Sequence, residues 1–182
     1  MIDALDPAVA LVVVDLQRGT VSGPVTPPAD TIVRNARSLA DAFRAAGLPV
    51  VRASATGVPP GRTDYGGARP LPEGWNDPLE DFPVADGDIV VERTTWSAFA
   101  GGPLHERLRD LGVTQVVVVG LATSFGVEST ARGAYDLGYS VAVVTDAVGD
   151  RSEASHDHTL TGVLPALAQT GATADVLASL RH

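Results

Sequence analysis

The feature that most constrains the fold is an almost unbroken apolar run near the start of the sequence. Residues 9–15 read VALVVVD, so that only apolar residues lead up to Asp15. Apolar runs without polar alternation are typical of strands that are covered on both faces, as the strands of a parallel sheet are. The run therefore predicts a buried strand in such a sheet.

Apolar runs and helical patterns alternate along the rest of the chain. Further strands are expected at residues 48–53, 89–91, 115–119 and 140–144, with a short sixth strand at 172–176. Helices are expected at residues 30–46, 104–111, 124–137 and 153–167. The alternation predicts a doubly wound parallel sheet, and a length of 182 residues suits a single α/β domain over 1–182.

The composition excludes several kinds of chemistry. The chain has no cysteine, and all 13 of its basic residues are arginine, so thiolate catalysis, cysteine metal sites and lysine Schiff bases are ruled out. The net charge of −9 argues against nucleic acid as a partner, and no apolar run is long enough to span a membrane. The N-terminal segment lacks the basic region of a signal peptide, and a cytoplasmic location is expected.

The candidate site consists of the residues that follow the expected strands, because doubly wound sheets bind ligands at the carboxyl ends of their strands. These are Asp15, Arg93, the segment 120–126 and Asp146. A carboxylate in this place is either a general acid or base or an ordinary loop acid. Arg93 either binds an anion or belongs to a structural ion pair. A helix that begins near Ser124 offers free amides to an anion, or is a plain connection.

Other residues carry weaker signals. Trp96 and Phe99 follow Arg93 and either wall a pocket or pack in the core. Histidines and carboxylates do not gather at metal-ligand spacing, so no metal site is predicted. No glycine-rich nucleotide motif is present, and no cofactor is expected. The histidines, all expected on the surface, are His105, His156, His158 and His182.

Three ordered motifs resemble one family. VVVDLQ, VVERTTWSAFAGGPLHERLRDLGV and GLATSFGVESTARGAYDLGYSVAVVTDA together resemble the isochorismatase-like hydrolases, which include nicotinamidases, N-carbamoylsarcosine amidohydrolases and ureidoacrylate hydrolases. The resemblance runs from about residue 8 to residue 170. It implies a Rossmann-like three-layer fold, with a six-stranded parallel sheet and helices on both faces. It also implies a homodimer or larger homo-oligomer.

The catalytic residues of that family are an aspartate, a lysine and a cysteine. The resemblance places them at Asp15, Arg93 and Gly126, with a cis peptide bond between Leu121 and Ala122. Gly126 cannot form the acyl enzyme of the amidase branches. The isochorismatase branch, which hydrolyses a vinyl ether, also carries glycine there, although it tends to have a lysine in place of Arg93 and an aromatic residue in place of Ala122.

Two other segments bear on the comparison with the family. The metal ligands of the nicotinamidase branch are missing after the second strand, where Arg52 and Ser54 stand instead. The long segment 54–86 is rich in proline and glycine and contains Tyr65 and Trp75. It is expected near an oligomer interface or over the pocket.

We therefore expect a hydrolase of a small anionic metabolite that uses neither cysteine nor metal, with ether hydrolysis of the isochorismatase type favoured. Asp15 is the expected general acid or base, Arg93 its electrostatic partner, and the amides of residues 122–126 an anion-stabilising wall. Two rivals remain: a catalytically silent metabolite- or partner-binding member, and an amidohydrolase that uses water or the hydroxyl of Ser124 or Thr94. The expected substrate-binding residues are Gln17, Trp96, Phe99, Leu121, Ala122, Thr123 and Phe125.

Overall fold

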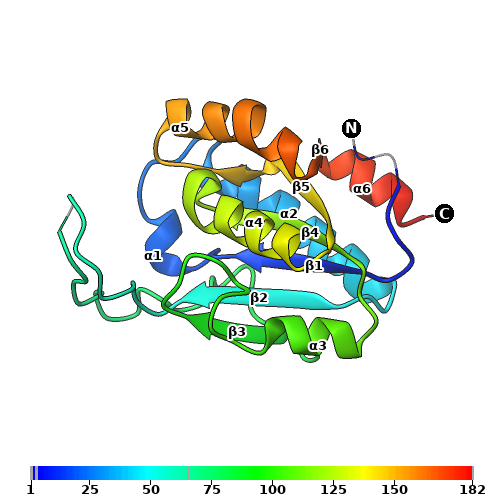
Figure 1. Cartoon of the computed structure of the whole chain (residues 1–182), viewed down its shortest axis with the longest axis horizontal. Helices are drawn as coiled ribbons and strands as arrows, with labels where there is room; N and C mark the ends of the chain where they lie inside the picture. The colour runs from blue at the N-terminus through cyan, green and yellow to red at the C-terminus, as the bar shows by residue number, and fades with distance from the viewer. Residues whose placement is uncertain (1, 3, 65, 182) are drawn as a thin grey trace.

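The protein is built on a six-stranded sheet with the strand order β3-β2-β1-β4-β5-β6 (Figure 1). This computed structural model describes residues 2, 4–64 and 66–181. Every neighbouring pair of strands is parallel. The strands are β1 (Val9–Val14), β2 (Val50–Ala55), β3 (Ile89–Arg93), β4 (Gln115–Leu121), β5 (Ser140–Gly149) and β6 (Gln169–Gly171).

Helices cover both faces of the sheet and lie in every connection between consecutive strands except that from β2 to β3, which confirms the expected three-layer α/β fold. The α-helices are α1 (Arg18–Val21), α2 (Ala29–Ala45), α3 (Leu104–Asp110), α4 (Glu128–Asp136), α5 (Glu153–His158) and α6 (Thr173–Ser179). Three further helical segments differ from the α-helix: the wider π-helical turns η1 (Thr123–Val127) and η2 (Thr159–Val163), and the tighter 3₁₀-helical turn η3 (Leu164–Ala166).

The two faces of the sheet bury separate sets of side chains. On one face, the strands pack against α2 and α6; on the other they pack against α3 and α4 (Figure 1). Successive residues of β1 alternate between the two clusters, with Val12 in one and Val13 in the other, and both are at most 1% exposed. This two-sided burial explains why β1 contains no polar residue.

The strand order reverses between β1 and β4, and this places the site. The chain builds β2 and β3 on one side of β1 and then returns to add β4, β5 and β6 on the other. In an open parallel sheet the crevice at such a switch point lies beyond the carboxyl ends of the strands. The residues that follow Val14 and Leu121 therefore face one another across this crevice.

Two expected elements differ from the structure, the fifth strand and the sixth. The fifth strand, β5, does not end at Val144 but continues to Gly149 after a shift in its register with β4. Asp146 therefore lies inside the strand, and its carboxylate accepts hydrogen bonds from the backbone N–H and hydroxyl of Thr173 at the start of α6. The sixth strand, expected at residues 172–176, lies earlier, at Gln169–Gly171, and Thr173–Ser179 forms the helix α6 with Ala172 as its N-cap.

One part of the long segment between β2 and β3 projects from the protein, and another part packs against it. Some of it projects outward beyond α1 (Figure 1). Trp75 returns to pack on Gly19, where an added Cβ would lie 2.0 Å from the indole ring. Two expectations, those for Tyr65 and His182, lie outside the described residues.

Candidate active site

Asp15 stands at the end of β1 in an unusual backbone conformation. Its φ of +49° makes it the single described residue other than glycine with a positive φ. Aspartate and asparagine tolerate this left-handed region better than most residues, and outliers of this kind concentrate at functional sites. The conformation is held by backbone contacts: the Asp15 N–H donates to the Ala53 carbonyl at 2.8 Å, and its carbonyl accepts from the Thr20 hydroxyl.

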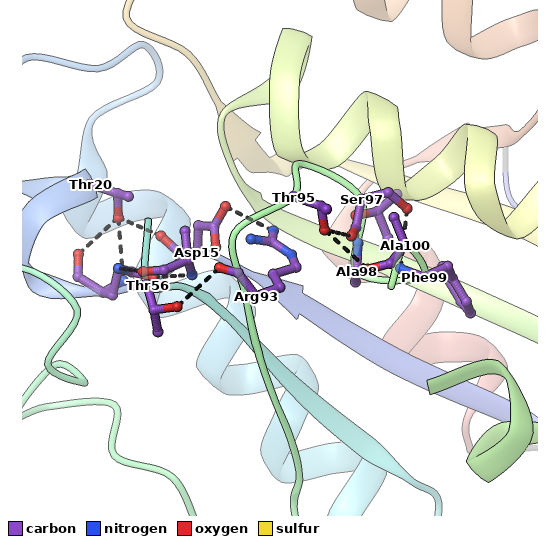
Figure 2. A network of polar contacts seen from close by, with 12 residues as sticks. Asp15, Thr20, Thr56, Arg93, Thr95, Ser97, Ala98, Phe99 and Ala100 are labelled. Atoms are coloured by element: carbon purple, nitrogen blue, oxygen red, sulfur yellow. Dashed lines mark hydrogen bonds and ion pairs between the residues drawn. The ribbon is translucent and has the colours of Figure 1, made fainter. Parts of the chain in front are cut away.

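Arg93 ends β3 and reaches across the sheet edge to Asp15 (Figure 2). Its Nη2 donates to Asp15 Oδ2 at 3.0 Å, and the side chains of Arg93 and Asp15 are 3% and 12% exposed. The Arg93 carbonyl accepts from the Thr56 N–H at 2.8 Å, which fixes the end of the strand. The two residues thus form a buried ion pair at the switch point.

The pair leaves polar atoms without partners. Within the part of the chain that the structure describes, Asp15 Oδ1, Arg93 Nε and Arg93 Nη1 are buried and accept or donate no hydrogen bond. An unsatisfied buried polar group costs about 1–3 kcal/mol, and more when it is charged. A ligand that supplied an acceptor to Arg93 and a donor or proton acceptor to Asp15 would recover this free energy.

Burial raises the pKa of the Asp15 carboxyl above its ordinary value, because the charged form loses its hydration. The charge and hydrogen bond of Arg93 oppose this effect and do not cancel it. A carboxyl with a raised pKa keeps its proton to higher pH and can act as a general acid nearer neutrality.

Gly126 packs directly against this carboxylate. A Cβ at position 126 would lie 3.0 Å from Asp15 Oδ2, 2.9 Å from Val14 Cγ1 and 3.0 Å from the Leu121 carbonyl oxygen. Gly126 belongs to the π-helical turn η1, which follows a cis peptide bond between Leu121 and Ala122. The structure therefore brings Asp15, Arg93 and Gly126 together, with no free space for a side chain at position 126.

The amides expected to stabilise an anion are partly occupied. The Ser124 N–H and hydroxyl both donate to Asp150 Oδ2 at 2.8 Å, and the Phe125 N–H donates to the Ala122 carbonyl at 3.0 Å. These two amides cannot also bind a substrate anion, because a single N–H supports one strong hydrogen bond. Of the amides of residues 122–126, those of Ser124 and Phe125 are thus engaged within the protein.

Asp150 was not anticipated from the sequence. It is 2% exposed, and its other carboxylate oxygen accepts from the Ser152 N–H at 3.2 Å. It follows β5 directly, so the rule that picks acids at strand ends applies to it. The rule selected Asp146 instead because the expected strand ended five residues too early.

A cavity of about 260 Å³ opens beside the ion pair. It includes the predicted residues Trp96, Leu121, Ala122 and Phe125, together with residues not predicted to bind substrate, among them Trp75 and Arg151. The ring of Trp96 meets that of Phe125 edge to face at 4.9 Å between centroids. The residues that line the cavity are Asp15, Thr20, Val25, Ala55, Gly57, Val58, Trp75, Arg93, Thr95, Trp96, Leu121, Ala122, Phe125, Gly126 and Arg151.

Three residues expected to bind substrate do not line this cavity. The Gln17 side-chain amide joins the end of β1 to β2, since its nitrogen donates to the Ala55 carbonyl and its oxygen accepts from the Ala55 N–H, both at 2.9 Å. Phe99 packs in the core against Tyr139, with 5.5 Å between ring centroids. Thr123, the first residue of η1, is fully buried.

The expectation that every histidine lies on the surface is wrong for His156. This residue is 6% exposed, and its Nδ1 lies 2.9 Å from the Thr123 hydroxyl oxygen. It thereby ties α5 to η1. His105 is half-buried against the Tyr139 hydroxyl at 3.0 Å, and His158 is exposed.

The position at which the nicotinamidase branch would hold a metal does not suit one. Arg52 is 6% exposed, its guanidinium lies 3.9 Å above the Phe82 ring, and it donates to the Phe82 and Pro83 carbonyls at 3.0 Å. A fixed guanidinium of this kind would repel a metal cation. Among residues 2, 4–64 and 66–181, no three histidine or carboxylate side chains come close enough to share a metal ion.

The hydroxyls of the rival nucleophiles are not placed for attack in this cavity. Ser124 donates its hydroxyl to Asp150, and neither Ser124 nor the exposed Thr94 is among the described lining residues. His156 contacts Thr123 and not Ser124. Among the described residues, the Asp150 carboxylate accepts the Ser124 hydroxyl, and no side-chain base forms a hydrogen bond with the Thr94 hydroxyl.

A larger hollow of about 680 Å³ lies at the opposite end of the sheet, against Gln115, Tyr139 and Gln169. Its carboxylate, Asp6, already accepts from the Thr114 hydroxyl at 2.7 Å. We locate the candidate site at the smaller cavity because that is where buried charged groups lack partners.

A doubly wound sheet with a buried ion pair in a cavity at its switch point defines an α/β protein built to bind or transform a small ligand. The Isochorismatase domain matches residues 9–175. The chain therefore belongs to the isochorismatase family, whose members are hydrolases.

Individual relatives agree with this assignment. The chain is 35% identical to the uncharacterized isochorismatase family protein YwoC of Bacillus subtilis over 185 residues, which covers 94% of each chain. It is 39% identical to streptothricin hydrolase of Streptomyces noursei over 79% of this chain and 55% of that protein. The structure of an isochorismatase family protein from Burkholderia thailandensis superposes with a TM-score of 0.94, at 38% identity over 99% of both chains.

Proposed function

We propose that the protein hydrolyses a small anionic metabolite without a cysteine nucleophile, with Asp15 as general acid and base and Arg93 as the group that binds the substrate anion. The observation that carries this proposal is the buried Asp15–Arg93 pair, which keeps three unpartnered polar atoms beside a cavity. Ether hydrolysis of the isochorismatase type suits the site best, because this reaction requires no nucleophilic side chain and position 126 is glycine.

The reaction would proceed in three steps. Protonated Asp15 transfers its proton to the methylene carbon of a vinyl ether, and the adjoining carbon becomes an oxocarbenium ion. Water adds to that carbon and returns a proton to Asp15, which restores the acid. The resulting hemiketal then breaks its bond to the leaving oxygen, its hydroxyl proton passes to that oxygen, and an alcohol and a ketone are released. Throughout the reaction, Arg93 binds a carboxylate of the substrate. The proton transfers to and from Asp15 require no metal ion.

The experiment that tests this proposal is a hydrolysis screen of the purified wild-type protein. We expect turnover of a carboxylate-bearing vinyl ether such as isochorismate, and little turnover of nicotinamide, ureido acids and carbamoyl acids. Product release is followed by chromatography, with heat-denatured protein as the control. Inactivity on all compounds, together with tight binding of one of them, would favour a silent binding protein instead.

We further propose that the protein acts in the cytoplasm as a homodimer or larger homo-oligomer, with the segment 54–86 near the interface. Part of this segment projects from the body of the protein (Figure 1), and Val58 and Trp96 expose 43% and 53% of their surface beside the cavity. No helix in the described ranges is long and apolar enough to cross a membrane. Light scattering at micromolar concentration should give at least twice the mass of 18.7 kDa, and a monomer would contradict the proposal.

A further inference from the structure

The cavity carries the opposite charge to the protein as a whole. The chain has a net charge of −9, yet the described lining residues include one carboxylate, Asp15, and two guanidinium groups, Arg93 and Arg151. The wall is therefore positive by one unit when Asp15 is ionised and by two when it is protonated. Arg93 has a role in the proposed function, whereas Arg151 has none so far.

Arg151 is an exposed arginine that forms no ion pair with the described acidic side chains. It takes part in none of the ion pairs or hydrogen bonds found among the described side chains. Its guanidinium carbon lies 3.5 Å from where a Cβ on Gly23 would stand, so it packs beside a residue without a side chain. The neighbouring acid, Asp150, is turned inward to Ser124 and Ser152 and does not face it.

The two arginines occupy different depths of the same cavity. Arg93 is 6% exposed and forms part of the floor with Asp15, while Arg151 is exposed and lies at the mouth. Apolar side chains of Leu121, Trp96 and Phe125 complete the wall. The volume of about 260 Å³ is close to the lower limit of ordinary ligand pockets, about 300 Å³, and suits a molecule with a single ring.

We propose that Arg151 is a specificity-determining residue that binds a second anionic group of the substrate at the mouth of the cavity. The preferred ligand is then a dianion whose acidic groups are separated by an apolar, ring-sized centre. This rests on the proposed function only in so far as Arg93 binds the first anionic group. A flexible exposed arginine gains most when it pairs with a carboxylate in a partly desolvated place such as this.

The two tryptophans of the chain allow a direct binding test. Trp75 and Trp96 are the whole tryptophan content, and both line the cavity, so quenching of tryptophan fluorescence reports on ligands at this site. The probes are benzoate, isophthalate and terephthalate, which share one ring and differ in the number and spacing of their carboxylates. We expect the wild-type protein to bind at least one dicarboxylate about tenfold more tightly than benzoate, which corresponds to about 1.4 kcal/mol.

The matched variants are Arg151→Gln and Arg34→Gln, since Arg34 is an exposed arginine on α2 that lines none of the cavities described above. Arg151→Gln should abolish the preference for the dicarboxylate and leave the affinity for benzoate unchanged. Arg34→Gln should behave as wild type. Raising the salt concentration should also reduce the preference, because Arg151 is exposed and its charge is screened.

Several outcomes would overturn the proposal. These are failure of all three probes to bind at millimolar concentration, equal affinity for benzoate and both dicarboxylates, or an Arg151→Gln variant that retains the preference. Failure of the proposed function leaves a different pattern: a protein that hydrolyses nothing in the screen can still prefer dicarboxylates through Arg151. Thermal melting of Arg151→Gln within a few degrees of wild type excludes misfolding as the cause.

Discussion

Replacing Asp15 with asparagine should reduce kcat by about 10²–10⁴-fold, which is the usual contribution of general acid–base catalysis. Asparagine removes the transferable proton and little else. It tolerates the φ of +49° at this position, and its side-chain oxygen can still accept from Arg93 Nη2. Binding should therefore change much less than turnover, so KM should stay near its wild-type value. The measurement is steady-state kinetics on the substrate found in the screen.

Two controls separate a loss of acid catalysis from a loss of structure. Asp41→Asn removes a carboxylate that is 66% exposed and pairs with Arg44 on α2, and should leave kcat unchanged. The pH profile is the second control. The raised pKa of Asp15 means that wild-type kcat/KM should be constant at low pH and fall as the pH rises through that pKa, because the general acid is then lost. Asp15→Asn should lack this fall, and an unchanged profile would argue against Asp15 as the acid.

The site follows from the sequence where strand ends are easy to locate. The apolar run of β1 has a sharp end, and the rule that ligands bind beyond strand ends leads directly to Asp15. Arg93 is found in the same way, although the structure is needed to establish that its Nη2 lies 3.0 Å from Asp15 Oδ2. The order of the strands around the switch point then brings together residues that are 78 positions apart in the chain.

The rest of the site depends on contacts that have no local signature. The polar residues Thr145 and Asp146 interrupt the apolar pattern of β5, so its continuation to Gly149 was missed, and with it Asp150 and Arg151. Trp75 reaches the cavity only because a long irregular segment folds back onto Gly19.

His156 is a different case, because the sequence contains a signal for its burial. Its position in the helical pattern is three residues before Thr159 and eight before Leu164, both of which are buried. These spacings place the three residues on one face of a helix. Polarity alone suggested a surface residue, and the periodicity of the helix was the better guide.

Restoring a side chain at the family nucleophile position should damage the site. A Cβ on Gly126 would come within 2.9 Å of Val14 Cγ1, which is fully buried, and within 3.0 Å of the backbone oxygen of Leu121. The buried side chain of Val14 and the backbone of Leu121 cannot shift easily. The carboxylate of Asp15, the third neighbour, must therefore move. Misplacement of a catalytic group by about 1 Å can cost 10²-fold in rate. Gly126→Ala should therefore lose about 10²-fold in kcat.

Gly162→Ala is the matched control for this variant. Gly162 also lies in a π-helical turn, η2, but a Cβ there meets only His158 at 3.4 Å, an ordinary contact. Overpacking at position 126 should lower the free energy of unfolding by about 1–3 kcal/mol, offset by up to about 1 kcal/mol because alanine favours helix over glycine. Gly162→Ala should only raise the free energy of unfolding, by up to about 1 kcal/mol, because alanine favours helix over glycine and no overpacking opposes it. Urea unfolding of both variants measures the difference.

Gly126→Cys carries the same argument to the chemistry of the family. A thiol in place of the glycine hydrogen needs the room that a Cβ needs and more, so it should displace Asp15 from Arg93 rather than act beside them. We expect this variant to lose hydrolysis of the native substrate and to gain no hydrolysis of nicotinamide, ureido acids or carbamoyl acids. Burst kinetics on those amides would detect an acyl enzyme. Its appearance would mean that the crevice can open around position 126, and that glycine there reflects the loss of a nucleophile from an otherwise intact amidase site.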